Sequence, residues 1–298
     1  MKALKIVLGV VGFLAIVLVV FYLGFVANPY HGERCTWHLD LARVRQLASS
    51  LPGDKPKEIR VEDVSGMDIP RSLACPGRPF SKAQFRVYSY QLVFPEQTIV
   101  VDTAMSPSQA KDIGMVNGYE EAAWRRVTAA LGSAAAIYVT HEHTDHMGGA
   151  FADDKWAGRL RLTPRQLDSR SATQPRISPA ARAAAKVIAY EQYEAVAPGV
   201  VLIAARGHTP GSQMIFVQRA DGTEVLLTGD TAWLIDNIEH EQPPPKFAFW
   251  ITRGDANENA CQLSSLKRAD QEIAIMPGHD PDRMKALLER GVFVRGFK

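Results

Sequence analysis

Three histidines and an aspartate fall within six residues of the stretch VTHEHTDHMGG, residues 139–149. The whole chain has eight histidines, so this clustering asks for a chemical reason. Neutral imidazoles and carboxylates are the ligands that zinc and related divalent ions prefer. A solvated loop is the alternative explanation. The stretch lies between an apolar run and a glycine pair, as expected at the end of a buried strand.

Three further polar motifs also follow apolar runs directly. They are ARGHTPGS, LLTGDT and IMPGHD, which carry His208, Asp230 and His279. Strand ends followed by loops are where α/β layers gather their sites, so we expect the four motifs to lie together. A buried histidine usually has a hydrogen-bonded structural role, but five of the eight histidines belong to these motifs. The pattern therefore favours a metal site.

The intervening segments alternate between strand-like and helix-like patterns. Strands are expected over 85–94, 98–101, 134–140, 159–163, 200–205, 292–297, twice within 214–230 around the turn Asp221-Gly222, and once within 272–280. Helices are expected over 39–51, 119–131, 179–195, 257–271 and 282–290. Such alternation, with hairpins mixed in, predicts a layered α+β or α/β fold in which helices cover mixed sheets.

Residues 1–27 predict a single transmembrane helix that anchors the chain. No charged residue occurs between Lys5 and Glu33, and an apolar run of about 20 residues can span a bilayer. A cleaved signal peptide is the alternative, but its apolar region is usually shorter and Phe25 stands where a small residue is preferred. Lys2 and Lys5 predict a cytoplasmic N-terminus, which places the main domain on the periplasmic side of a bacterial inner membrane.

Residues 28–79 are expected to form a connector with one short helix. In an oxidising compartment Cys35 and Cys75 could pair and pin this connector to the main domain. The alternative is that Cys35, Cys75 and Cys261 are three unrelated buried thiols. The formal net charge of +2 shows no basic excess of the kind that nucleic-acid binding requires, so no nucleic-acid partner is expected.

The motifs HEHTDH, GHTPGS, TGD and PGHD, in this order, resemble the metallo-β-lactamase superfamily of metallohydrolases. The resemblance covers roughly residues 80–298, the expected hydrolase domain. It implies an αββα sandwich with a two-metal site at one edge of the sheets. Together with the N-terminal segment, it predicts a membrane-anchored metalloenzyme.

The resemblance also implies a set of ligands. His141, His143 and His208 would hold one ion, Asp145, His146 and His279 the second, and Asp230 would bridge the two. Zinc is the expected metal, and iron or manganese would accept the same ligands. A hydroxide held between two such ions attacks the substrate at neutral pH, because the metals lower the pKa of water. Asp145 and Asp230 are the carboxylates that we expect to be catalytic.

Three other residues are weighed for supporting roles. Asp102, in the motif VVDTA, is expected to fix the tautomer of a ligand histidine, or else to be a turn aspartate that ends a strand. Trp233 either lines an apolar substrate pocket or belongs to the core. His240 lies outside the motifs and is either a surface residue or part of the pocket.

Within the superfamily, the lactonase-like branch that includes acyl-homoserine lactonases looks most similar. The bridging Asp230 argues against a β-lactamase, and the 19 residues after His279 are too few for the glutathione-binding domain of related thioesterases. Those lactonases carry a tyrosine where this chain has Trp233, which has no hydroxyl. We therefore expect an ester hydrolase acting on a small-molecule lactone, and a site near a membrane would suit an amphiphilic substrate. A thioesterase, a phosphodiesterase and a catalytically inactive metal-stabilised binding module are the alternatives.

Overall fold

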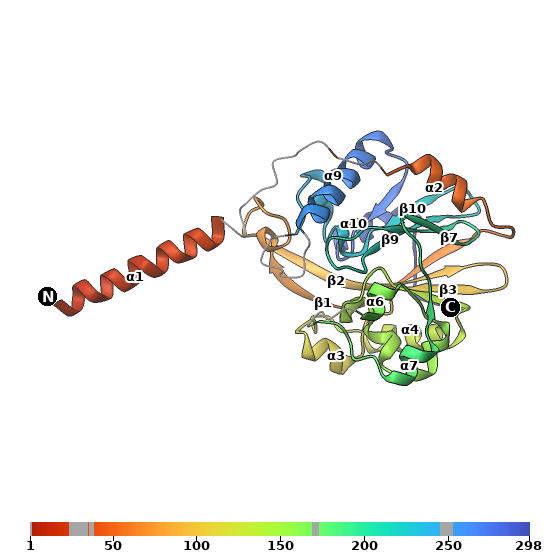
Figure 1. Ribbon diagram of the computed structural model, residues 1–298, viewed down its shortest axis with the longest axis horizontal. Helices are drawn as coiled ribbons and strands as arrows, with labels where there is room; N and C mark the ends of the chain where they lie inside the picture. Colours follow the sequence, from red (N-terminus) through yellow and green to blue (C-terminus); the bar gives the residue numbers. More distant parts are fainter. Residues whose placement is uncertain (1, 24–34, 36–38, 169–172, 245–252) are drawn as a thin grey trace.

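The computed structural model describes residues 2–23, 35, 39–168, 173–244 and 253–298. Within these residues, two five-stranded sheets pack face to face, and helices cover both outer faces (Figure 1). This arrangement is the αββα sandwich that the sequence predicted.

The first sheet has the strand order β12-β1-β2-β3-β4. Its strands are β1 (Glu58–Pro70), β2 (Lys82–Val93), β3 (Thr98–Val101), β4 (Ala136–Tyr138) and β12 (Val294–Arg295). β1 and β2 form a long antiparallel hairpin, and β3 runs antiparallel to β2. β4 runs parallel to β3, so the C-terminal ends of β3 and β4 lie at the same edge of the sheet.

The second sheet has the order β11-β10-β9-β8-β7. Its strands are β7 (Tyr193–Ala197), β8 (Val200–Ala204), β9 (Gln213–Gln218), β10 (Glu224–Leu227) and β11 (Ala274–Met276). β9 is antiparallel to both β8 and β10, and β11 is parallel to β10. The chain therefore leaves β8, β10 and β11 at one common edge. A small parallel pair, β5 (Arg161–Leu162) and β6 (Lys186–Val187), stands apart.

The strands β8, β9, β10 and β11 of the second sheet are buried on both sides along most of their length. In β8, Val200 and Leu202 belong to the core between the sheets, whereas Val201 and Ile203 pack against the outer helices. This follows from the two-residue period of a strand, and it explains why such strands read as continuous apolar runs. The inner core thus packs the two sheets against each other.

Helices close the two outer faces. On the first sheet, α4 (Glu121–Ser133) buries Trp124 and Val127. On the second sheet, α2 (Leu41–Ala48) and α9 (Arg253–Ala269) contribute to the outer core. The remaining helices are α3 (Pro107–Asp112), α5 (Thr144–Met147), α6 (Pro164–Asp168), α7 (Pro179–Ala184), α8 (Ile235–Glu239) and α10 (Pro281–Glu289).

Three short helices share one starting signal. Ser106, Ser178 and Asp280 cap α3, α7 and α10, and each side chain accepts a hydrogen bond from a backbone N–H of the first turn. A proline follows each cap near the first helical position, where its missing N–H costs nothing. The cap at Asp280 fixes the chain directly after His279.

The prediction of a connector over 28–79 is wrong for its second half, because this half contains β1. In β1 the charged Glu58 and Arg60 alternate with the buried Ile59 and Val61, which is the pattern of a half-buried strand. The strand pairs with β2 along almost its whole length. The first sheet therefore starts at Glu58.

The helix expected over 179–195 is also wrong in its second half. Helix α7 ends at Ala184, Lys186 and Val187 pair with β5, and β7 pairs with β8. The alanine-rich start favours a helix, but strand pairing overrides helix propensity in the residues that follow.

Cys35 forms a disulfide, but its partner is not Cys75, which the sequence suggested. Cys35 pairs with Cys261 on α9, with a Cα–Cα distance of 5.7 Å. Cys75 is a free, buried thiol. The bridge therefore joins the segment after the N-terminal helix to the outer layer of the second sheet, and not to the β1–β2 hairpin.

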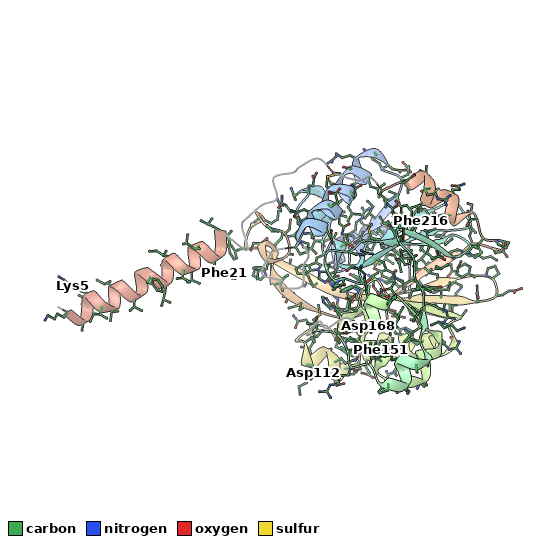
Figure 2. The ribbon with its side chains drawn as sticks, in the orientation of Figure 1. Lys5, Phe21, Asp112, Phe151, Asp168 and Phe216 are labelled. Atoms are coloured by element: carbon green, nitrogen blue, oxygen red, sulfur yellow. A yellow bond between two sulfur atoms is a disulfide. The ribbon has the colours of Figure 1, made fainter. Side chains whose placement is uncertain are left out.

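The N-terminal helix α1 (Lys2–Phe21) stands apart from the sandwich (Figure 1). Its side chains between the labelled Lys5 and Phe21 point outward along the whole helix, and none is buried (Figure 2). Among the described residues it is the one helix long and apolar enough to cross a membrane, with a mean hydropathy of 2.9. A signal sequence has the same length and composition.

Candidate metal centre

The four polar motifs meet at one edge of the sandwich. The candidate ligands His141 and His143 follow β4, His208 follows β8, Asp230 lies in the 3-10 helix η5 (Gly229–Thr231) after β10, and His279 follows β11. All of these side chains are buried. Their strands end at the same edge of the two sheets, which brings residues up to 138 positions apart into one cluster.

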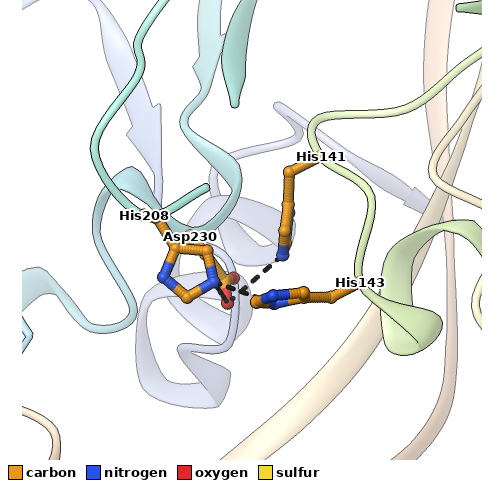
Figure 3. Close-up of side chains that lie close together, drawn as sticks. All are labelled: His141, His143, His208 and Asp230. Carbon is orange, nitrogen blue, oxygen red and sulfur yellow. Dashed lines mark hydrogen bonds and ion pairs between the residues drawn. The ribbon is translucent and has the colours of Figure 1, made fainter. Parts of the chain in front are cut away.

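One group forms around oxygen Oδ2 of Asp230. The rings of His141, His143 and His208 converge on this carboxylate (Figure 3). Nε2 of His208 lies 3.2 Å from Asp230 Oδ2 and 3.0 Å from Nδ1 of His143. Nε2 of His141 lies 3.7 Å from the same oxygen.

A second group forms around the other oxygen of the same carboxylate. Nε2 of His146 lies 3.1 Å and Nε2 of His279 lies 3.0 Å from Asp230 Oδ1. Asp145, on the short helix α5, places its Oδ2 3.4 Å from Nε2 of His146 and 3.5 Å from Nε2 of His279. Asp230 therefore presents one oxygen to each group.

Both groups fit a divalent ion. Ligand atoms around a tetrahedral zinc lie about 3.3 Å apart, because each bond measures about 2.0–2.1 Å. The candidate ligand atoms in each group all lie within 4.8 Å of one another. Within the described part of the chain, Nε2 of His141 is buried without a hydrogen-bond partner. Such a nitrogen costs free energy unless it binds something, so it supports a metal at this place.

Hydrogen bonds on the far side of two rings set their tautomers. Nδ1 of His146 lies 2.8 Å from Asp102 Oδ2, and Nδ1 of His279 lies 2.9 Å from the carbonyl oxygen of Arg86. Each Nδ1–H donates to an oxygen, which leaves the Nε2 lone pair directed at the centre. Asp102 also accepts hydrogen bonds from the backbone N–H and the hydroxyl of Thr140. Asp102 therefore contacts His146, which is the contact that its expected role requires.

The charges around His143 and Asp145 favour the protonation states in which these two residues can bind a metal ion. Burial, reinforced by the neighbouring His208, lowers the pKa of His143 to about 3, so its ring is neutral at ordinary pH. Burial alone would raise the pKa of Asp145, but the imidazoles of His146 and His279 outweigh it and lower the pKa to about 2. A neutral imidazole and an ionised carboxylate are the forms that bind a divalent ion.

His146 shows the opposite tendency. Burial lowers its pKa, but the carboxylates of Asp145, Asp230 and Asp102 outweigh this effect and raise the pKa well above the usual value. These three carboxylates favour a positive charge at the imidazole of His146. A proton or a divalent ion can supply that charge, so the two compete for Nε2 of His146.

Glu142 is a buried residue of the first motif that the sequence reasoning did not consider. Its carboxylate accepts hydrogen bonds from the hydroxyl of Thr209, at 2.7 Å, and from the backbone N–H of Gly211, at 3.2 Å. It thereby ties the loop that carries His143 to the loop that carries His208. A charged residue between two buried histidines was the available signal.

Two glycines of the motifs allow the backbone to approach the ligands closely. A Cβ atom on Gly278 would lie 2.5 Å from Asp230 Oδ1, and one on Gly229 would lie 2.5 Å from Cβ of Thr140. Gly229 also has a positive φ of 49°, which side-chain-bearing residues rarely adopt. The glycines of TGD and PGHD are therefore part of the geometry of the centre.

The two residues weighed for the substrate pocket lie in different surroundings. Trp233 is half-buried and its Nε1–H donates to Asp230 Oδ2 at 2.9 Å. His240 is exposed at the C-terminal end of α8. Both pocket assignments remain predictions.

A sequence model of the Metallo-beta-lactamase superfamily matches residues 84–279. The chain belongs to this superfamily. The predicted resemblance is thereby confirmed.

Curated relatives narrow the branch. N-acyl homoserine lactonase AiiA of Bacillus thuringiensis subsp. kurstaki is 28% identical over 222 residues, which cover 67% of this chain and 83% of the relative. An N-acyl homoserine lactonase of Bacillus sp is 28% identical over 216 residues, covering 65% of this chain and 81% of the relative. The chain is thus similar to N-acyl homoserine lactonases within this superfamily.

Solved structures share the fold. An N-acyl homoserine lactone hydrolase with the product N-hexanoyl-L-homoserine at its catalytic metal centre matches with a TM-score of 0.62 and 22% identity, over 78% of this chain and 96% of its own. A probable metal-dependent hydrolase from Staphylococcus aureus matches with a TM-score of 0.56 and 12% identity, over 77% and 91%. At these identities the likeness establishes the sandwich alone.

Proposed function

We propose that this protein is a dinuclear metal hydrolase that opens a lactone ring, with an acyl-homoserine lactone as the model substrate. The single observation that carries the proposal is the carboxylate of Asp230, which gives one oxygen to each of two ligand groups. The similarity to N-acyl homoserine lactonases supports the choice of a lactone.

In this proposal the chain's own residues hold and orient two ions. His141, His143 and His208 would hold one ion, Asp145, His146 and His279 would hold the other, and Asp230 would offer a carboxylate oxygen to each. Zinc is the proposed metal, because tetrahedral nitrogen and oxygen sites suit it. Two bound divalent ions would lower the pKa of water toward neutrality and polarise the ester carbonyl.

The carboxylates of Asp145 and Asp230 have the catalytic roles in this scheme. Both lie among imidazoles that hold their pKa values below the usual range against the opposing effect of burial. They stay ionised through the pH range in which an ester hydrolase works, so they keep both ions in place. Trp233 and His240 are proposed to line the path of the substrate.

We further propose that α1 anchors the protein in the bacterial inner membrane with the sandwich on the periplasmic side. Two independent features support this location. The helix has no charged residue after Lys5, and Lys2 and Lys5 lie at its start; positive charge stays on the cytoplasmic side. The disulfide between Cys35 and Cys261 suits an oxidising compartment. A membrane-bound site would favour amphiphilic substrates with a long acyl chain.

The test uses the full chain in detergent, with metal content measured by mass spectrometry. A lactone, a thioester, a phosphodiester and a β-lactam are offered in parallel. We expect about two zinc ions per chain and turnover of the lactone. We expect His143→Ala to weaken the binding of one of the two ions and to abolish turnover. If only the thioester or the phosphodiester is turned over, that compound takes the place of the lactone as the substrate class. The proposed metal centre would still stand.

The rival class is a binding module without catalysis, and Asp145→Ala distinguishes it. An enzyme that needs the second ion loses nearly all turnover in this variant while it stays folded, as judged by circular dichroism. A chain that shows no turnover of any of the four substrates with two ions bound would not be a hydrolase of these classes.

A further inference from the structure

Trp233 stands beside the bridging carboxylate and points its one polar atom at it. Its indole Nε1–H donates to Asp230 Oδ2 at 2.9 Å. An indole nitrogen is a donor only, so the direction of this hydrogen bond follows from its chemistry. Oδ2 is also the oxygen that faces His208, at 3.2 Å, and so belongs to the first ligand group.

The position of the indole is fixed from several sides. The backbone N–H of Trp233 donates to Oδ1 of Asn237 at 3.0 Å, and its carbonyl accepts the N–H of His279 at 3.0 Å. The ring packs edge-on against Phe85 and against His208, with centroid distances of 5.5 Å and 5.9 Å. The donor is therefore held in place before any ion binds.

The buried Asn237 completes this support. Its Oδ1 also accepts the N–H of Leu234, and its Nδ2 donates to the carbonyl oxygens of Ala74 and Gln242. Each of the four hydrogen bonds is to the backbone, and the side chain is 1% exposed. Because the amide is fully satisfied, it locks the turn that presents Trp233.

A bridging aspartate needs such a partner, because the last torsion of an aspartate side chain is broad. A carboxylate that turns freely presents its oxygens to the two ligand groups only part of the time. A carboxylate oxygen has two lone pairs, so Oδ2 can accept the indole N–H and still serve an ion. Oδ1 then points at His146 and His279, as observed.

We propose that Trp233 is a positioning residue that fixes the rotation of Asp230 through its indole N–H, so that each carboxylate oxygen serves one ion. The inference rests on the dinuclear centre proposed above and adds to it a residue that makes no bond to metal. It also gives Trp233 a role other than contact with the substrate, because the only hydrogen-bond donor of its side chain is committed to Asp230.

The test compares Trp233→Phe with a matched variant, Trp156→Phe, in the full chain in detergent. Phenylalanine keeps a ring beside Phe85 and removes the donor. The indole N–H of Trp156 makes no hydrogen bond within the described part of the chain. Trp156 belongs to the hydrophobic cluster that covers the outer face of the first sheet. Zinc affinity is measured by competition with a chelator.

We expect Trp233→Phe to weaken zinc binding about 10–100-fold, which is the usual effect of losing a residue that orients a metal ligand. Trp156→Phe leaves zinc affinity within about twofold of the unchanged protein, since no hydrogen bond of the centre is lost. Cobalt substitution adds a spectroscopic readout. The absorption of the bound cobalt shifts in Trp233→Phe and stays as in the unchanged protein in Trp156→Phe.

A second measurement follows hydrogen exchange in the unchanged protein. The indole proton of Trp233, assigned by its loss in Trp233→Phe or by selective labelling, exchanges slowly with solvent both with and without zinc. The proposal would be overturned if Trp233→Phe bound both zinc ions as tightly as the unchanged protein does. It would also be overturned if the indole proton exchanged as fast as an exposed one. If the unchanged chain binds less than one zinc ion, the proposed function fails, and the exchange rate still decides whether Trp233 holds Asp230.

Discussion

Asp102 is a single residue that contacts a candidate ligand, His146, through a hydrogen bond. It lies at the end of β3 with a positive φ of 54°, and its carboxylate accepts hydrogen bonds from Thr140 and from His146. Positive φ values are uncommon outside glycine, although aspartate tolerates them better than most residues. A backbone held in this region at a buried carboxylate indicates that the position of the carboxylate matters.

Asp102→Asn tests that role. The amide cannot accept every hydrogen bond that the carboxylate accepts, so an N–H of the amide faces either Thr140 or His146. We expect the tautomer of His146 to become unfavourable and zinc affinity to fall about 10–100-fold. Isothermal titration with zinc measures the change. Asp112→Asn, at an exposed aspartate that ends α3, is the matched control. Equal affinities in the two variants would contradict the role of Asp102.

Gly278→Ala tests the close approach of backbone to the bridging aspartate. The added Cβ would lie 2.5 Å from Asp230 Oδ1 and 3.0 Å from the carbonyl oxygen of Gly229. Since the carbonyl cannot move easily, we expect Asp230 to be displaced, with loss of at least one of the two zinc ions. Zinc content per chain is the measurement. Gly158→Ala, where the added Cβ meets nothing within 4 Å, should keep both ions, and a Gly278→Ala protein with two ions would refute the expectation.

The sequence predicted the candidate ligands better than it predicted the residues that support them. The family resemblance implied a set of candidate ligands, and the structure brings these residues together as two groups: His141, His143, Asp145, His146, His208, Asp230 and His279. Glu142 and Asn237 were missed because their hydrogen bonds join segments that are distant in sequence. The contact between Trp233 and Asp230 likewise depends on a side-chain orientation that spacing alone does not determine.

At the scale of elements, strands that are buried on both faces were predicted well. β3 and β8 read as continuous apolar runs, and the structure places both between covered faces. β1 was missed because its many charged residues resemble a connector, although Ile59 and Val61 alternate with them. The helix over 179–195 was overextended because composition does not reveal the pairing of β6 with β5 or of β7 with β8.

The pairing of the cysteines gives a prediction about elements far apart in the chain. Cys35 and Cys261 are joined across 226 positions, and Cys75 is free. Burial, reinforced by the charge of Asp236, raises the pKa of Cys75 to about 12. Because the thiolate is the reactive form, we expect no thiol to react with iodoacetamide at pH 8 in the native protein. One should react after denaturation and three after denaturation with reduction.

The same bridge contributes to stability. Linking distant positions restricts the unfolded chain, so Cys261→Ser should lower the free energy of unfolding by about 2–4 kcal/mol. Chemical denaturation of the variant and of the unchanged protein, with and without reductant, measures the difference. Reductant should destabilise only the unchanged protein. A Cys75→Ser protein that loses sensitivity to reductant would show that the bridge involves Cys75 instead.

For the molecule as a whole, the location that we propose rests on α1. If it is an uncleaved anchor, the intact mass of the cellular protein includes residues 1–27 and the protein stays with membranes after washing at alkaline pH. Detergent then releases it. A mature chain that lacks this segment would instead identify a signal peptide. Protease added to cells with an opened outer membrane should digest the sandwich while the inner membrane remains closed.

We propose that Asp230 joins two metal-ion sites that act together on an ester. The most direct measurement is a zinc titration of the metal-free full chain, with lactone hydrolysis recorded at each step. We predict little turnover below one zinc ion per chain, and full turnover only as the second ion binds. Asp230→Asn should bind the ions more weakly and never reach that turnover. Full activity with a single bound zinc ion, or none with two, would contradict the account.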